Sequence, residues 1–116
     1  MIENKNTNIV YLSNLLQTDE RFEKTCNHLK QVLEKRNIKY KFLKSTKDIW
    51  CRDYMPIQVD KDKFIQFRYE PSYLKNDIQL QSDPKIVCKA NKIEPEFSSI
   101  NLDGGNVVIL SLFYNL

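Results

Sequence analysis

The chain has 116 residues, of which 41% are hydrophobic and 28% charged, and its net charge is +3. This length fits one domain with a single modest core. No apolar run approaches the roughly 18 residues of a membrane span, and no basic start leads into an apolar export signal. The basic residues are scattered through every segment, so the sequence predicts neither membrane nor nucleic-acid binding.

The cysteine pattern favours a reducing compartment. The three cysteines, Cys26, Cys51 and Cys88, form no C-x-x-C pair. An odd number without such a pair argues against both a disulfide framework and a zinc site. We therefore expect a cytoplasmic protein with no metal and no other cofactor. Cys26 and Cys88 fall at apolar helical positions, which predicts that both are core residues.

The first part of the chain has the pattern of a strand, a helix and a second strand. Residues 8–13 form a β-branched and aromatic run long enough for one buried strand. Thr18 is a candidate N-cap for a helix that continues to about residue 36. Residues 39–44 alternate apolar side chains with lysines, which completes a βαβ unit.

The predicted helix has one apolar face, on which residues follow at spacings of four, three and four. These residues are Phe22, Cys26, Leu29 and Leu33. We expect Phe22, Leu29 and Leu33 to be buried against Val10 and Leu12 of the first strand. The only histidine, His28, is predicted to lie on the helix surface.

Residues 46–58, TKDIWCRDYMPIQ, follow the second strand at its C-terminal end, where α/β sheets usually bind ligands. Trp50, Arg52 and Asp53 combine an indole with charges of both signs. Carboxylates pair with cations and an indole face adds a cation–π contact, so the segment suits the rim of a pocket for a flat, cationic ligand. The alternative is an ordinary loop with one Arg–Asp pair.

The second half of the chain adds a hairpin, a short helix and a strand. Residues 56–60 and 63–69 are short strand-like runs joined by two residues. Residues 71–82 have no apolar period and predict a loop. Asp83 and Pro84 then supply a cap and a first helical residue for a short helix to residue 92, and a strand follows at 97–102.

Both glycines of the chain, Gly104 and Gly105, lie in one predicted turn directly after Asp103. A Gly-Gly pair permits positive φ or a close approach of backbone to a ligand, and the neighbouring carboxylate can point into a pocket. The alternative is a plain hairpin into the apolar run 107–112. Residues 107–116, VVILSLFYNL, lack the charge that usually closes a domain, which predicts that the polypeptide is cut short.

Three segments resemble, in the right order, landmarks of the agmatine deiminase and bacterial peptidylarginine deiminase family. They are DIWCRDYMPIQ at 48–58, KFIQFRYEPSYL at 63–74 and NLDGGNVV at 101–108, the last being similar to the acid-Gly-Gly-Asn turn of the family. The resemblance spans most of the chain but corresponds to only about the first third of a full-length member of the family.

This resemblance implies an α/β fold of the pentein type, a five-bladed αβ propeller of ββαβ-type modules. Residues 1–116 would then be the N-terminal portion of a single pentein domain, C-terminally truncated, with about one and a half modules. A propeller fragment leaves sheet edges open, so self-association through those edges is expected.

The resemblance also implies an activity, the hydrolysis of guanidino groups to a ureido product and ammonia, as in putrescine biosynthesis from agmatine. By motif, Asp53 matches the guanidinium-binding aspartate and Trp50 the aromatic pocket wall, and both would contact a small guanidino compound or an arginine peptide. Asp103 stands where the family often has a Glu that orients the catalytic histidine. Arg52 is expected to be a structural partner of nearby carboxylates.

The catalytic His-x-Asp motif and the late nucleophilic cysteine of the family have no counterpart in this chain. Cys51 is close to Asp53, but a thiolate between carboxylates has a raised pKa, which argues against Cys51 as the nucleophile. Two hypotheses therefore remain. The chain is either part of a guanidine deiminase that is inactive alone, or a non-catalytic guanidinium-binding or interaction fragment.

Overall fold

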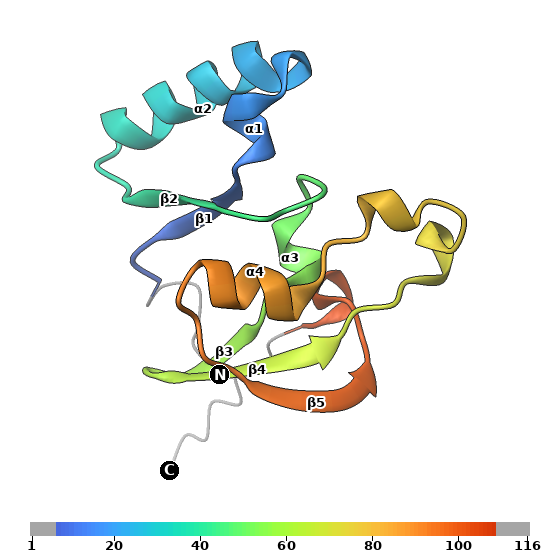
Figure 1. Cartoon of the computed structure of the whole chain (residues 1–116). Coiled ribbons are helices and arrows are strands. Elements are labelled where there is room, and N and C mark those ends of the chain that lie inside the picture. Colours follow the sequence, from blue (N-terminus) through green and yellow to red (C-terminus); the bar gives the residue numbers. More distant parts are fainter. Residues whose placement is uncertain (1–6, 109–116) are drawn as a thin grey trace.

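The computed structural model describes residues 7–108, in which helices pack on two small sheets (Figure 1). The strands are β1 (Val10–Ser13), β2 (Tyr40–Leu43), β3 (Ile57–Asp60), β4 (Lys63–Arg68) and β5 (Glu96–Asn101). The α-helices are α1 (Leu15–Thr18), α2 (Glu23–Lys35), α3 (Cys51–Tyr54) and α4 (Pro84–Ala90). Single 3₁₀ turns are η2 (Glu20–Phe22), η3 (Ser72–Leu74), η4 (Ile78–Leu80) and η5 (Gly104–Asn106). Within the described residues, no helix is long and apolar enough to cross a membrane.

The predicted βαβ unit is confirmed. Strand β1 pairs in parallel with β2, from Val10 opposite Tyr40 to Ser13 opposite Leu43. Parallel neighbours need a crossover, and α2 supplies it by lying along one face of the pair (Figure 1). Helix α2 buries Cys26 and leaves His28 exposed, as the periodicity predicts.

The predicted start of the long helix is wrong. Thr18 does not cap it, because Thr18 is already the last residue of the short helix α1, and its hydroxyl donates to the carbonyl of Asn14, the N-cap of α1, at 3.2 Å. Asp19 takes the capping role one residue later. Its carboxylate accepts a 3.0 Å hydrogen bond from the Arg21 backbone N–H and so begins η2 rather than α2.

The predicted burial on this unit is only partly correct. Leu33 is buried and Leu29 half-buried, but Phe22 is also only half-buried and Val10 is exposed. The 13-residue helix α2 spans about 20 Å. The four-residue strands span about 13 Å. The sheet is therefore too short to cover the helix along its full length.

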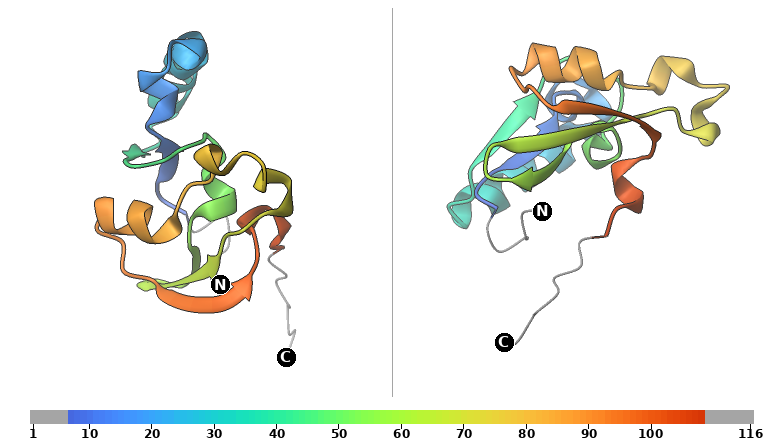
Figure 2. Two further views of the ribbon diagram at one scale, coloured as in Figure 1. Left: turned by 45° about the vertical axis from the view of Figure 1, so that its right-hand side comes forward. Right: turned by 90° about the horizontal axis from the view of Figure 1, so that it is seen from below.

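The second half of the chain contains the predicted hairpin, helix and strand. Strands β3 and β4 pair antiparallel, and β5 pairs in parallel with the other edge of β4 after the crossover through α4. The Asp83 carboxylate caps α4 by accepting a 2.8 Å hydrogen bond from the Lys85 N–H, and Pro84 is the first helical residue, as predicted. Figure 2 shows α4 covering one face of this sheet.

One core joins the two units. Its buried members come from β2, from α3, from the residue after β4 and from α4: Leu43, Tyr54, Tyr69 and Val87. Helix α3 lies between the two sheets, and its Tyr54 ring is completely buried (Figure 1). The segment between β2 and α3 is also fixed, because the Lys47 N–H donates to the buried Ser82 hydroxyl at 2.9 Å. The position of α3 is therefore set by both units.

Candidate functional site

The two glycines let the third landmark pack directly on the first. A Cβ atom on Gly104 would lie 2.0 Å from the backbone oxygen of Arg52, and one on Gly105 would lie 2.6 Å from Oδ1 of Asp53. Neither glycine has positive φ. Of the two uses of the Gly-Gly pair that the sequence suggested, positive φ is wrong, and a close approach to a ligand stays a prediction. The close approach that the structure shows is to helix α3 of the chain itself.

This contact brings Asp53 and Asp103 together. The position that a Cβ of Gly105 would take lies 2.6 Å from Oδ1 of Asp53 and 3.7 Å from Oδ1 of Asp103. Burial raises the pKa of the Asp53 carboxyl, and the negative charge of Asp103 raises it further. A hydrogen bond from the Gly105 backbone N–H and the charge of Arg52 act in the opposite direction. The site thus holds two carboxylates that repel each other.

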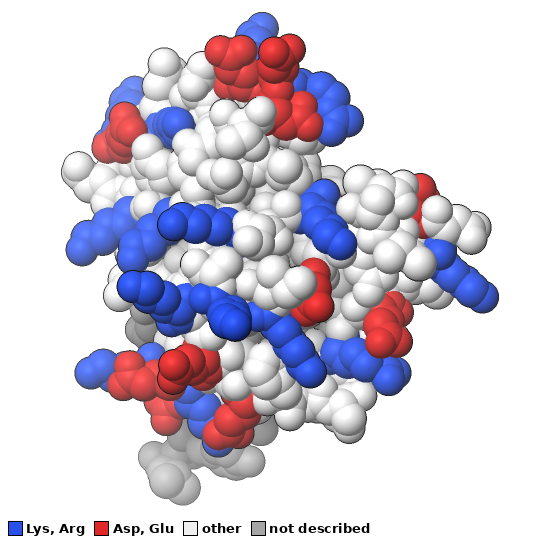
Figure 3. All heavy atoms as spheres, viewed as in Figure 1, with Lys and Arg blue, Asp and Glu red and all other residues white. Residues whose placement is uncertain are grey.

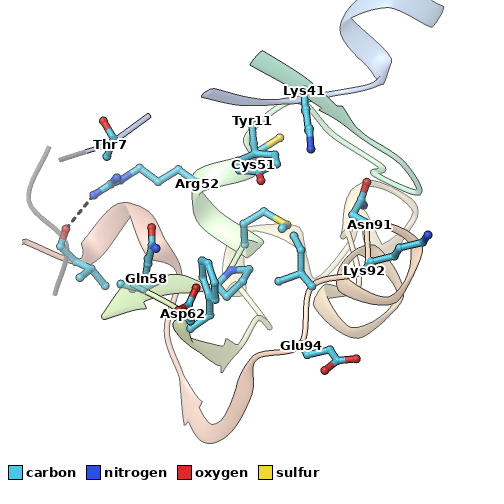
Figure 4. Close-up of a pocket in the computed structure, with 17 residues that line it drawn as sticks. Thr7, Tyr11, Lys41, Cys51, Arg52, Gln58, Asp62, Asn91, Lys92 and Glu94 are labelled. Atoms are coloured by element: carbon cyan, nitrogen blue, oxygen red, sulfur yellow. Dashed lines mark hydrogen bonds between the residues drawn. The ribbon is translucent and has the colours of Figure 1, made fainter. Parts of the chain in front are cut away.

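Arg52 has a different partner from the one expected. Its guanidinium donates to the Val107 carbonyl at 3.2 Å (Figure 4). Among residues 7–108 it forms no ion pair with a carboxylate. The hydrogen bond ties the end of η5 to α3, so Arg52 holds the two landmarks together, and its charge also lowers the pKa of Asp53 without a direct ion pair.

Trp50 immediately precedes α3, and its indole is 67% exposed. Its backbone N–H donates to Oδ1 of Asp48 at 2.9 Å, and its carbonyl accepts from the Asp53 N–H at 3.0 Å. The backbone of Trp50 is therefore fixed beside Asp53, while the ring face stays accessible to a ligand. The indole does not line any of the main cavities of the described chain.

Asp48, to which the sequence assigned no separate role, is a third carboxylate of this region. Burial raises its pKa, and the charge of Asp53 adds to the rise, against a lowering hydrogen bond from the Trp50 N–H. Only its place in the motif could have identified it. Three acidic residues therefore lie on or next to α3 and η5, two of them with raised pKa values.

Cys51, the first residue of α3, is half-buried. Burial raises the pKa of its thiol, and the charge of Asp48 raises it further, while a hydrogen bond with the Tyr54 hydroxyl, 3.4 Å from Sγ, lowers it. The predicted direction is confirmed, although burial rather than the carboxylates is the main cause. A thiol with a raised pKa is a poor nucleophile at neutral pH.

Cys51 and Arg52 line a groove of about 900 Å³, drawn in Figure 4, together with residues of β1–β4 and of the segment after α4. Trp50, Asp53 and Asp103 do not line it. The groove is therefore separate from the carboxylate pair, although α3 contributes residues to both. In the part of the chain that the structure describes, no group of three or more His, Cys, Asp or Glu side chains could hold a metal ion.

The carboxylate pair and its surroundings have features that suit an organic cation. The two carboxylates near Gly105 provide negative charge, and the exposed Trp50 provides a flat surface. The hydrogen bond from the Gly105 N–H orients Asp53. Neither His28 on the surface of α2 nor the thiol of Cys51 is part of this pair. Comparison of the chain with protein-family models, with curated proteins and with solved structures finds no match.

Proposed function

We propose that Asp53, Asp103 and Trp50 form the guanidinium-binding part of a guanidine deiminase of the agmatine or peptidylarginine type. The observation that carries this proposal is the convergence of Asp53 and Asp103 around Gly105 from segments far apart in the chain. Neither carboxylate is in an ion pair within the described residues. A bound cation would relieve their repulsion.

The chemistry of the ligand fits this arrangement. A guanidinium group is planar and presents N–H donors along its edges, which carboxylates accept in pairs. Its face stacks on aromatic rings, and the exposed Trp50, whose backbone carbonyl accepts from the Asp53 N–H, offers such a ring. Agmatine and arginine side chains both carry this group, so the pair of carboxylates suits either of them.

The arrangement of the elements supports the same proposal. Strands β3 and β4, helix α4 and strand β5 follow in the order ββαβ, which is the order of a pentein module. The first and third landmarks of the resemblance meet in space as α3 and η5. A fragment of a pentein propeller, together with part of its substrate site, would bring them together in this way.

We expect the purified chain to bind agmatine weakly and not to hydrolyse it. Binding between carboxylates stabilises the ground state, whereas cleavage needs a nucleophile and a proton donor at the reacting carbon. The measurement is release of ammonia and ureido product from agmatine and from an arginine peptide, beside calorimetric titration with both. Robust turnover that is lost in Cys51→Ser would overturn the assignment of Cys51 and make it the nucleophile. Absence of any guanidinium binding would contradict the proposed site.

Asp53→Asn should weaken agmatine binding about tenfold while leaving the fold as stable or slightly more stable. The amide still accepts from the Gly105 N–H but removes the repulsion of Asp103. Because Asp53 is partly exposed, the gain in unfolding free energy should stay below about 1 kcal/mol. Titration with agmatine and urea unfolding measure the two effects, and Asp60→Asn, on the exposed end of β3, is the matched control.

The raised pKa of Asp53 predicts that stability and agmatine binding depend on pH in opposite directions. The pKa of Asp53 is higher in the folded chain, so its contribution to stability is present below the unfolded pKa and is lost as pH rises through the folded pKa. Agmatine binding should follow the opposite course, strengthening as Asp53 ionises. Asp53→Asn should flatten both curves. An unchanged binding curve in this variant would exclude Asp53 as a ligand group.

The second candidate function is non-catalytic guanidinium binding. It is favoured by the placement of the two residues that could act in catalysis. His28 is exposed on α2, and the Cys51 thiol has a raised pKa and faces the groove. Both candidates predict binding without turnover in this chain alone. They differ once a segment with a His-x-Asp motif and a nucleophilic cysteine is supplied, because part of a deiminase should then release ammonia and a binding module should not.

A further inference from the structure

The fold gathers lysines that are scattered in the sequence. Three exposed lysines lie on β2 and in the segment after it. Three more lie along one side of α4 and just beyond its end, at spacings of four and three residues. The six are Lys41, Lys44, Lys47, Lys85, Lys89 and Lys92. Figure 3 shows cationic side chains crossing the middle of the molecule over β2 and α4. We call this surface the lysine face.

Specific hydrogen bonds hold the two rows of lysines side by side. The Asn91 side chain accepts from the Lys44 N–H at 3.0 Å and donates to the Lys44 carbonyl at 3.1 Å. At the other end of α4, the Lys47 N–H donates to the Ser82 hydroxyl at 2.9 Å. None of the six lysines forms an ion pair with a described residue. Lys85 lies over the Phe97 ring, with Nζ 5.4 Å from its centroid, so the lysine face is a concentration of positive charge that has no carboxylate partner among residues 7–108.

The groove of about 900 Å³ opens onto this face. Its lining includes apolar side chains from both units, namely Tyr11, Met55, Ile57, Phe64 and Ile93. Figure 4 shows Lys41 and Lys92 at its edge, with Glu94 close to Lys92 and Asp62 farther from both lysines. Tyr11 is 44% exposed and Ile86, on α4 next to Lys85, is 56% exposed, so apolar surface continues beyond the groove.

We infer that the lysine face and the groove dock an acidic polypeptide segment that places an apolar side chain in the groove. Lysines without a carboxylate partner on two elements complement the carboxylates of an acidic segment, and the apolar part of the groove lining gives its anchor a surface on which to bury a side chain. A second copy of this chain is disfavoured because its net charge is also positive. This inference is independent of the guanidinium site, whose three residues do not line the groove.

The mixed charge at the groove favours a polypeptide over a nucleic acid. Asp62 and Glu94 lie at the same groove as Lys41 and Lys92. A phosphate chain carries uniform negative charge and would be repelled by Asp62 and Glu94. A polypeptide can put carboxylates opposite the lysines and a neutral or basic residue opposite Glu94. Single-stranded DNA is therefore the comparison that the experiment needs.

The test uses fluorescence anisotropy with labelled probes and the whole chain. The first probe is a peptide of glutamates interrupted by leucines, the second has serines in place of the leucines, and the third is a DNA oligonucleotide of equal charge. We expect the leucine peptide to bind most tightly, with an affinity that falls as salt rises. Lys89→Glu combined with Lys92→Glu should weaken this binding about tenfold or more, because attraction becomes repulsion.

Two further variants separate docking from general charge. Lys24→Glu with Lys75→Glu reverses two exposed lysines outside the lysine face and should change affinity less than about twofold. Tyr11→Ser should weaken the leucine peptide several-fold and leave the serine peptide unchanged, since it alters only the apolar lining. Circular dichroism and urea unfolding establish that every variant is folded. Equal effects of the two double reversals, or tighter binding of DNA than of the leucine peptide, would overturn the inference.

Discussion

Replacing Tyr54 by alanine should leave most of the chain unfolded at room temperature. The Tyr54 side chain is 0% exposed, and it packs in the core with Leu43, Tyr69 and Val87. Removing a buried aromatic ring typically costs about 3–5 kcal/mol, which is comparable with the whole stability of a small domain. Urea unfolding followed by circular dichroism and by the fluorescence of Trp50 measures the loss.

Tyr54→Phe is the matched control. It keeps the ring but removes the hydroxyl, which donates to the Asp48 carbonyl at 2.9 Å and lies 3.4 Å from the Cys51 sulfur. Loss of these contacts should cost about 1–2 kcal/mol, so this variant stays folded. If the alanine variant unfolded at nearly the wild-type urea concentration, the core that joins the two units would be different from the one described here.

Gly104→Ala should both destabilise the fold and abolish binding of guanidinium compounds. Its Cβ would lie 2.0 Å from the Arg52 carbonyl oxygen, and no side-chain rotation can relieve a clash with backbone. Helix α3 and η5 must move apart, at a cost of about 1–3 kcal/mol or more. The movement also separates Asp53 from Asp103. Thermal unfolding and titration with agmatine measure the two losses.

Gly105→Ala provides the comparison. Its Cβ would meet a carboxylate oxygen of Asp53 at 2.6 Å, which is the end of a side chain that can rotate. We therefore expect a smaller loss of stability than for Gly104→Ala but a clear loss of agmatine binding, because the rotation displaces Asp53. Equal stability of Gly104→Ala and the wild type would show that α3 and η5 do not pack as closely as the structure has them.

The regular elements could be predicted because their side-chain periods are local. The spacing of Cys26 and Leu33 gave α2, and the cap at Asp83 with Pro84 gave α4. Helices α1 and α3 were missed because each is a single turn, too short to show a period. The exposure of Val10 was missed because, among the described residues, β1 has a paired strand on one edge only, and the number of strands beside it cannot be read from a local window of sequence.

The candidate site was predictable only in part. The resemblance singled out Asp53, Asp103 and Trp50, and the fold brings the first two together. The partner of Arg52 could not be foreseen, since a carbonyl acceptor such as that of Val107 leaves no mark in the sequence. The lysine face was hidden for a similar reason, because contacts between Asn91 and Lys44 across the two units decide which lysines become neighbours.

The contact between α3 and η5 has a consequence for the order in which the protein folds. The hydrogen bond from Arg52 to Val107 joins residues that are 55 positions apart, whereas β1, α2 and β2 lie consecutively in the chain. Closing the longer loop loses more chain entropy, so contacts of this kind generally form late. The carboxylate pair would be absent from early folding intermediates and would be among the first features lost in local opening. A cation that binds it should therefore slow unfolding while leaving the rate of folding almost unchanged.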